Sequence, residues 1–240
     1  MPIDPAELAT SIGSLYKLDL DRGLAPTLQQ VVDAAKILAG ADGAGLMLAD
    51  SEGRLRWASA SDQFAQNAED HQEREAQGPC MAAFVQRTAM SVADAREGPD
   101  SYGMRSVLAK SDVLAAVSVP VELEGGPIGT LDLYSSKPRE WDNSEVSALQ
   151  AYAAIVASLL GAAVAAHATG RLAEQLQAAL EHRSLIERAK GILMARDDID
   201  AATAFERLRS AARSSRRPLT DVVREVIAGK PLASRRNSST

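Results

Sequence analysis

The sequence is poor in the residue types that build several common kinds of site and core. It has one cysteine, Cys80, together with three histidines and 4% aromatic residues among its 240 positions. A single cysteine excludes an intramolecular disulfide and a metal site made of several cysteines. The scarcity of aromatics predicts a core of Ala, Val, Leu and Ile. Apolar residues at 46% and charged residues at 24% are typical of a folded globular chain.

Long apolar runs are also missing. The longest candidate, residues 151–166, is shorter than the ~20 residues that a membrane span requires. The first residues, Met-Pro-Ile-Asp-Pro-Ala-Glu-Leu, are acidic and lack the apolar segment of a signal peptide. These features predict a cytoplasmic protein with no membrane contact.

The sequence contains no recognisable catalytic set. A P-loop, a Rossmann glycine pattern and a metal-ligand spacing are all absent, and the scattered Ser, His and Asp residues form no motif. We therefore expect a protein that is not an enzyme and that holds neither a cofactor nor a metal.

Charge is distributed unevenly along the chain. Residues 171–240 hold 14 Lys and Arg against 9 Asp and Glu, a net charge of +5, whereas residues 1–170 carry a net charge of −11. Two units with different partners are indicated, and the basic one is the candidate for contact with nucleic acid. A scatter of solvated charge is the alternative interpretation.

The acidic part alternates between helical and strand patterns. Asp142-Asn-Ser-Glu145 resembles a capping box at the start of a long helix, which Gly170 interrupts. Its apolar spacing suits either packing on the domain's own sheet or pairing in a dimer. The patterns before it predict helices over 5–20, 25–38 and 81–87, and a polar stretch at 62–77 that is helical or irregular. They also predict strands at 44–49, 55–59 and 90–93, and a hairpin of 115–123 with 128–134.

The basic part reads as three helices, which end near Arg196, span 201–213 and span 219–228. Each has an apolar face, and arginines lie outside these faces. The planar guanidinium fork of arginine suits phosphates and stacking on bases. The tail, residues 230–240, is polar and basic and is predicted to be disordered.

The motifs of these three helices resemble the ANTAR family. The resemblance is carried by 179–194, which contains Ala189-Lys190-Gly191, by Ala204-Phe205-x-x-Leu208-Arg209, and by Leu219-x-Asp221-Val222. It covers about 172–229. Val223 departs from the pattern, because the family usually has Ala there, and the larger side chain could alter the packing of the last helix.

The resemblance implies an RNA-binding antitermination module that acts as a dimer. Such modules hold a pair of short RNA stem-loops in a nascent transcript and so prevent a terminator hairpin from forming. Lys190→Ala is expected to weaken RNA binding without unfolding the bundle, and Gly191 to permit close backbone approach. The candidate RNA-binding residues are Arg183, Lys190, Gly191, Met194, Arg207, Arg209 and Arg213.

The order of elements in the acidic part resembles a GAF domain over about 24–168. Four short sequence motifs support this resemblance: Gly43-Ala-Gly45, Gly78-Pro79-Cys80, Val117-x-Val119-Pro120-Val121 and Gly129-Thr-Leu-Asp-Leu-Tyr134. The implied fold is α+β, an antiparallel sheet flanked by helices, and it is followed here by a long connecting helix and an all-α three-helix ANTAR domain. GAF domains commonly bind small ligands, so an unknown small molecule is a candidate partner.

The sequence does not identify that ligand. A suitably placed Cys or His for a bilin or haem is not apparent. Ser136-Lys137 and Trp141 match the cyclic-nucleotide signature of some GAF domains only in part. Cys80 lies near the start of a short helix, whose dipole could lower the pKa of the thiol and suit redox sensing. A small buried residue that packs this helix is the alternative interpretation of Cys80.

Together the two resemblances point to actinobacterial regulators that combine a GAF and an ANTAR domain. The expected division is an N-terminal helical segment (1–23), a GAF sensor (24–168), an ANTAR domain with its connecting helix (169–229) and the tail (230–240). The expected protein is a cytoplasmic homodimer. A DNA-binding regulator and a protein-interaction module that binds no nucleic acid are the alternatives.

Overall fold

The computed structural model describes residues 3–15, 24–50, 52–98, 100, 103–123, 126–165, 171–215 and 217–232. Within its helices, the side chains of residues 14–15, 163–165, 171–183, 202 and 213 are outside the description. The chain forms two compact units, residues 1–49 with 54–176 and residues 50–53 with 177–240.

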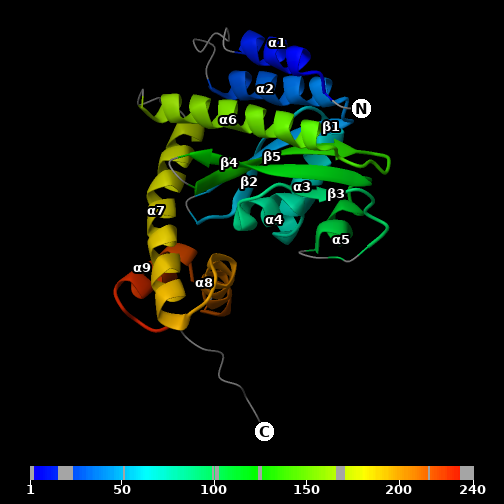
Figure 1. The fold of residues 1–240 in the computed structure, drawn as a ribbon. Helices are drawn as coiled ribbons and strands as arrows, with labels where there is room; N and C mark the ends of the chain where they lie inside the picture. Colours follow the sequence, from blue (N-terminus) through cyan, green and yellow to red (C-terminus); the bar gives the residue numbers. More distant parts are fainter. Residues whose placement is uncertain are drawn as a thin grey trace. The chain divides into compact units, whose positions relative to one another are not determined.

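The first unit is built on an antiparallel sheet of five strands in the order β2-β1-β5-β4-β3 (Figure 1). The hairpin of β4 and β5 forms its centre, and Ser118 lies directly opposite Asp132 in that pairing. The strands are β1 (Gly43–Ala49), β2 (Leu55–Ala60), β3 (Met90–Val92), β4 (Ala115–Leu123) and β5 (Gly126–Ser135).

Helices cover both faces of this sheet (Figure 1). One face carries α2 (Leu24–Ala39) and α6 (Asn143–Ala165), with α1 (Pro5–Leu15) packed outside α2. The other face carries α3 (Gln63–Glu75), α4 (Pro79–Gln86) and the short α5 (Met104–Leu108). This is the three-layer α+β arrangement expected from the sequence.

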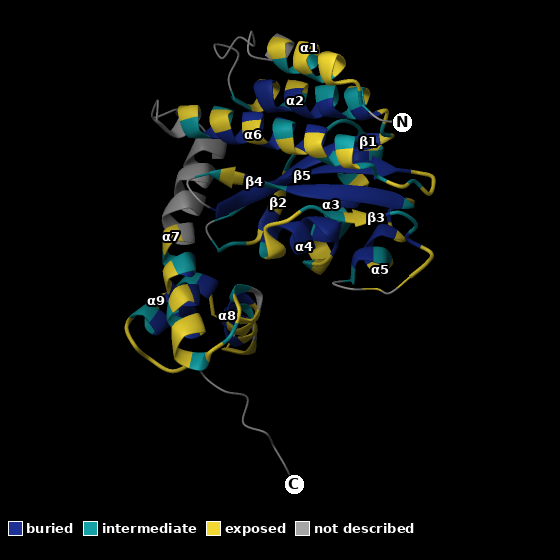
Figure 2. Cartoon of the chain, in the orientation of Figure 1, coloured by how far each residue is buried: buried dark blue, intermediate teal, exposed yellow. Residues whose placement is uncertain are grey.

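Strand β5 is buried along its entire length (Figure 2). It pairs with β1 on one side and with β4 on the other, so both edges of its backbone are hydrogen-bonded. Tyr134 packs in an apolar cluster with residues of α3, α4 and α5. Because side chains alternate along a strand, Asp132 points to the same helical layer as Tyr134.

Two helices of this unit, α6 and α3, begin at residues whose side chains cap them. Asp142 Oδ1 accepts from the amide nitrogens of Ser144 (2.8 Å) and Glu145 (3.1 Å), and Glu145 Oε2 accepts from the Asp142 amide (2.9 Å). This is the reciprocal capping box expected at the start of α6. In α3, Asp62 Oδ1 accepts from the Ala65 amide at 2.9 Å.

The second unit contains three helices, α7 (Arg171–Asp197), α8 (Ala201–Ser215) and α9 (Leu219–Ile227). Asp200 Oδ1 accepts from the Thr203 amide at 2.7 Å and caps the start of α8. Gly229 follows α9 with a positive φ of 81°, a conformation that glycine adopts without steric cost.

The predicted elements occur close to their expected bounds, and one element was missed. Helix α5 lies between β3 and β4, where the sequence analysis placed no helix. Residues 16–20 of the first predicted helix, the break at Gly170, the boundary near 168 and the tail from 233 onward lie outside the described residues.

Helix α6 corrects the statement that no segment is long enough for a membrane span. Residues Asn143–Ala162 reach that length with a mean hydropathy of 1.4. Half of this segment is buried inside the fold, and Tyr152, Val156 and Leu160 pack at 1% exposure or less. The apolar character therefore has a structural cause, because the helix packs on the sheet.

The close approach of β5 to β1 generates a stability prediction at Gly129. A Cβ atom there would overlap the backbone carbonyl of Met47 and press on the Leu48 side chain. Gly129→Ala is expected to lower the free energy of unfolding by about 3 kcal/mol, because a backbone atom of the neighbouring strand has to move. Urea unfolding measures this change.

Gly13→Ala is the matched control, because a Cβ on Gly13 in α1 meets nothing within 4 Å. Its stability should equal or slightly exceed that of the wild type, since Ala is the better helix former. Equal stability of Gly129→Ala and wild type would contradict the described register.

Candidate nucleic-acid interface and a buried acidic pair

The three helices of the second unit meet in one apolar core. Residues from all three faces predicted by the sequence are buried, which confirms the expected packing. Val223, which departs from the family pattern, is 0% exposed and packs inside this core. The buried apolar residues of the bundle are Ile186, Ala189, Leu193, Ala204, Phe205, Leu208, Ala211, Ala212, Leu219, Val222, Val223 and Val226.

Ion pairs join the end of α7 to α8. Asp197 Oδ1 accepts from Arg196 Nε (2.7 Å), and Asp197 Oδ2 accepts from Arg207 Nη1 (2.8 Å). These arginines hold the pKa of Asp197 below its usual range. Arg207 is exposed, so this exposed pair adds little to stability and leaves the guanidinium accessible.

Lys190 is buried, which the sequence analysis did not expect. Only 7% of the residue is exposed; its Nζ donates to Glu187 Oε1 at 2.8 Å. The same ammonium lies 6.0 Å from the centroid of the Phe205 ring, and Arg209 Cζ lies 5.9 Å from it. Lys190 thus packs from α7 toward α8, whereas Arg209 packs on Phe205 within α8. Lys190→Ala is expected to destabilise the bundle, contrary to the expectation from sequence.

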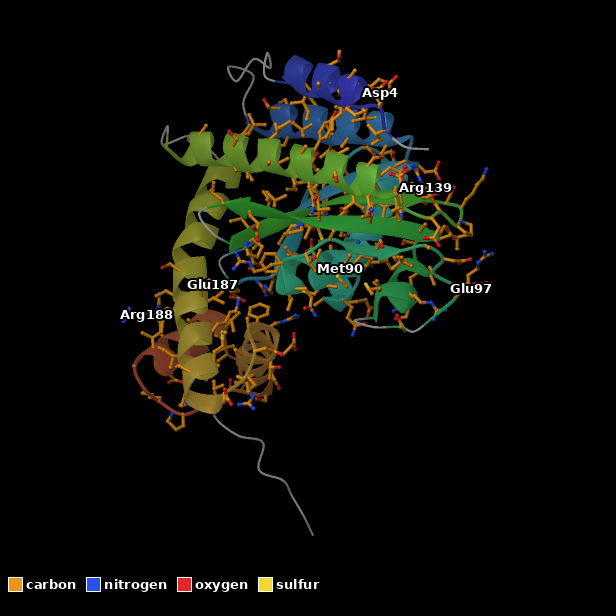
Figure 3. The ribbon with its side chains drawn as sticks, in the orientation of Figure 1. Asp4, Met90, Glu97, Arg139, Glu187 and Arg188 are labelled. Carbon is orange, nitrogen blue, oxygen red and sulfur yellow. The ribbon has the colours of Figure 1, made fainter. Side chains whose placement is uncertain are left out.

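Helix α7 presents a continuous exposed face opposite to the core. At 100° per residue, Ser184, Arg188, Gly191 and Ala195 lie within about 60° of one another on the helix surface. All four are exposed, and Figure 3 shows Arg188 projecting from α7 on the side away from α8. Met194 borders this face at 37% exposure.

Arg188 is a basic residue that the sequence analysis missed. It is exposed, and among the described residues it forms no ion pair. Its position three residues before Gly191, on the same side of the helix, was the feature of the sequence that could have identified it as a candidate contact. A Cβ on Gly191 would meet nothing within 4 Å, so the bundle itself does not require glycine there.

The other predicted RNA contacts are placed only in part. Arg183 lies on α7 and Arg213 on α8, but their side chains are outside the description. Arg209 donates to Glu206 Oε1 at 3.3 Å, and 17% of its side chain is exposed. The described surface of the bundle therefore offers Arg188, Arg207 and part of Arg209 to a negatively charged partner.

The first unit holds a pair of buried carboxyl groups, Glu69 on α3 and Asp132 on β5. Both residues are 0% exposed. Both carboxylate oxygens of Glu69 and Asp132 Oδ1 lack a hydrogen bond of good geometry, and Asp132 Oδ2 accepts from Thr130 Oγ1 at 2.9 Å. The Ser118 hydroxyl is buried beside Asp132 and also has no such bond.

Burial raises the pKa of both carboxyl groups. Burial is the main cause of a pKa well above the usual range at Glu69, followed by the negative charge of Asp132. Burial raises the pKa of Asp132 to about 7, against the opposing hydroxyl groups of Ser118 and Thr130. The Tyr134 hydroxyl oxygen accepts from Gln72 Nε2 at 2.8 Å inside the same layer, and its O–H group faces Glu69, where it opposes the rise in the pKa of that carboxyl.

Cys80 lies next to this pair, and the structure contradicts the expected low pKa. The residue is 1% exposed, and burial together with the charges of Asp132 and Glu69 raises the pKa of its thiol. Its amide donates to Gln72 Oε1 at 3.1 Å. The thiol form is therefore favoured, in keeping with the alternative interpretation of a small packing residue.

Within the described ranges, no three His, Cys, Asp or Glu side chains gather closely enough to hold a metal ion. Two carboxyl groups and several hydroxyl groups meet at the buried pair instead.

Comparison with known proteins identifies two domain families in the chain. A GAF domain model matches residues 23–160, and an ANTAR domain model matches residues 174–227. No curated protein matches the chain significantly.

Solved structures similar to the chain carry the same GAF fold. The GAF domain of a phosphoenolpyruvate-protein phosphotransferase from Coxiella burnetii is 18% identical with a TM-score of 0.55, and the match covers 68% of this chain and 96% of that one. Free methionine-R-sulfoxide reductase from Neisseria meningitidis, in complex with its substrate, is 20% identical with a TM-score of 0.51, covering 66% and 89%. At these identities the likeness concerns the fold alone.

The buried pair generates a prediction for the pH dependence of stability. Because the folded pKa values lie above the ordinary 4.5 of Glu and 3.8 of Asp, the folded state binds more protons than the unfolded state between those values and about 7. The contribution of Asp132 is therefore fully present below about pH 4 and is lost as the pH rises through about 7, and Glu69 acts with the same sign. Carboxyls with lowered pKa, such as Asp62, act with the opposite sign near and below pH 4.

Asp132→Asn is expected to flatten the decline in the free energy of unfolding between pH 5 and 8. Urea unfolding across this range measures the slope. Asp70→Asn removes a neighbouring, partly exposed carboxyl of α3 whose charge acts least on Glu69 among the causes named, and it should alter the slope far less. A slope that Asp132→Asn does not alter would show that the pair does not titrate in this window.

Proposed function

The chain belongs to the GAF family and carries an ANTAR domain, and on that premise we propose that it is an RNA-binding antitermination regulator. In this proposal the ANTAR domain binds two adjacent RNA stem-loops and prevents a terminator hairpin from forming. The match of the ANTAR model across α7, α8 and α9 is the observation that carries the proposal.

The outward face of α7 supports RNA contact. Glycine in a helix interior costs roughly 1 kcal/mol relative to alanine, and nothing in the bundle requires Gly191. A residue without a side chain at an exposed position lets a partner's backbone approach closely. Arg188 lies beside it and supplies an exposed charge for phosphate.

The remaining candidate residues take different roles in this proposal. Arg207 contacts phosphate from the middle of α8, and Met194 contacts a base at the border of the α7 face. Lys190 acts mainly by packing on Phe205 and so positions α7 against α8. Arg183, Arg209 and Arg213 remain proposed contacts from α7 and α8.

The GAF domain is proposed to sense a signal, to mediate homodimerisation, or both. The protein is proposed to act in the cytoplasm and without catalysis. The similar methionine sulfoxide reductase is an enzyme, but its likeness to this chain concerns the fold alone. The one cysteine here, Cys80, is buried with a raised pKa, which does not favour thiol chemistry.

Binding to three nucleic acids tests the proposal. The full chain is titrated with an RNA that carries two adjacent short stem-loops, with a scrambled RNA and with duplex DNA, across a salt series. Selective binding to the paired stem-loops that weakens as salt rises is expected. Preference for duplex DNA would favour the DNA-binding alternative, and binding to none of the three would favour a protein-interaction module.

Gly191→Ala is predicted to change stability and RNA affinity in opposite directions. The free energy of unfolding of the ANTAR bundle should rise by up to about 1 kcal/mol, because alanine is the better helix former and the new methyl group meets nothing. RNA affinity should fall, because the methyl group keeps the backbone of α7 away from RNA. Unfolding and RNA titration of the same variant measure both effects, and undiminished RNA affinity would remove Gly191 from the interface.

Arg188→Ala is predicted to weaken binding of the paired stem-loops about tenfold and to reduce the salt dependence by roughly one phosphate contact. Arg224→Ala is the matched control, because Arg224 is also exposed and, among the described residues, also forms no ion pair, but it lies on α9. An equal loss in both variants would indicate a general charge effect rather than contact through the α7 face.

A further inference from the structure

Four buried polar atoms converge between the sheet and helix α3 without a bonding partner of good geometry. They are both carboxylate oxygens of Glu69, Asp132 Oδ1 and Ser118 Oγ. Ser118 and Asp132 are cross-strand neighbours on β4 and β5, and Glu69 reaches them from the covering helix. Buried acceptors left without donors cost free energy, so such a cluster requires an explanation.

The negative charge of this cluster has no ion-pair partner among the described residues. The charged and titratable groups that act most strongly on Glu69 are Asp132, Tyr134 and Asp70, and those on Cys80 are Asp132 and Glu69. None of them is a cation. A carboxylate buried without a partner is costly enough that it takes up a proton or acquires a counter-charge.

The position of Glu69 is fixed by the backbone of β1. A Cβ on Gly45 would overlap the Glu69 carboxylate, so glycine at this position is what lets the carboxylate lie against the strand. The carboxylate is therefore held against β1, where it faces Asp132 and the hydroxyl group of Tyr134.

We propose that Glu69 and Asp132 form the recognition site of the GAF domain for a small organic cation that carries N–H groups, such as a primary ammonium or an amidinium. This inference rests on the proposed sensory role of the domain and specifies its ligand class. The N–H groups donate to the three carboxylate oxygens that lack partners, and the positive charge balances the pair. Ser118 Oγ lies beside Asp132 and accepts a further N–H group.

The two carboxyl groups can also lose their negative charge by taking up protons instead of binding a cation. A ligand cation binds best when both carboxyl groups are ionised, so protons and ligand compete. Binding should therefore strengthen between pH 6 and pH 8. Tyr134 and Cys80, which face the pair from β5 and α4, stay neutral in this range because burial raises the pKa of both.

The test uses methylammonium chloride as the probe and follows the thermal unfolding of the full chain at pH 6 and pH 8. Potassium chloride and tetramethylammonium chloride, at the same concentration, supply positive charge without N–H donors. At ten times its dissociation constant, a ligand of the folded state raises Tm by about 3–6 °C in a domain of this size. We expect this increase with methylammonium at pH 8, a smaller one at pH 6 and none beyond the ionic-strength effect with the other two salts.

Two isosteric variants and one control assign the effect to the pair. Asp132→Asn and Glu69→Gln should abolish the response to methylammonium while Asp70→Asn keeps it. The absence of a selective response in the wild type, or its survival in Asp132→Asn, would overturn the proposal and leave the pair as a proton-binding site only. If neither isosteric variant folds, the comparison of the three salts on the wild type still tests whether the protein binds a cation with N–H groups selectively.

This outcome is independent of the RNA test. Loss of the methylammonium response with intact binding of the stem-loops would refute the ligand class and leave the proposed antitermination function standing. A selective methylammonium response without any RNA binding would support the ligand class and refute the proposed antitermination function.

Discussion

Strand β5 lies between β1 and β4 and is buried along all ten of its residues, and this burial constrains most of the first unit. Close pairing with β1 requires the missing side chain of Gly129. Alternation along the strand then directs Asp132 and Tyr134 into the layer of α3 and α4, where water does not reach them. The acidic pair, the raised pKa of Cys80 and the hydrogen bond between Gln72 and Tyr134 all follow from this one placement.

Some basic residues of the second unit pack between or along its helices, and others are exposed on its surface. Lys190 of α7 approaches the Phe205 ring of α8 and fixes the two helices against each other. Arg209 packs on the same ring within α8, and the exposed Arg207 pairs with Asp197 of α7. The face of α7 opposite to the core keeps Arg188 and Gly191 exposed. A helix fixed on one side and open on the other is suited to present a rigid contact surface to RNA.

Local patterns in the sequence predicted most elements but not the burial of individual polar residues. The Asp142 capping box and the apolar faces of α7, α8 and α9 are short-range features, so periodicity and spacing were sufficient to place them. Lys190 was expected to be accessible because its burial depends on Phe205, 15 residues further along the chain. The Glu69–Asp132 pair joins a helix to a strand 63 residues away, and the sequence pattern contains no signal for it. The RNA contacts themselves remain a prediction.

Transcription through a terminator tests the central claim most directly. A template that encodes two adjacent stem-loops, the second overlapping a terminator hairpin, is transcribed in vitro with increasing amounts of the full chain. The account predicts that readthrough rises with protein and that disrupting the first loop of the template abolishes the rise. Termination that stays constant while the protein is bound to the paired stem-loops would contradict antitermination as the function.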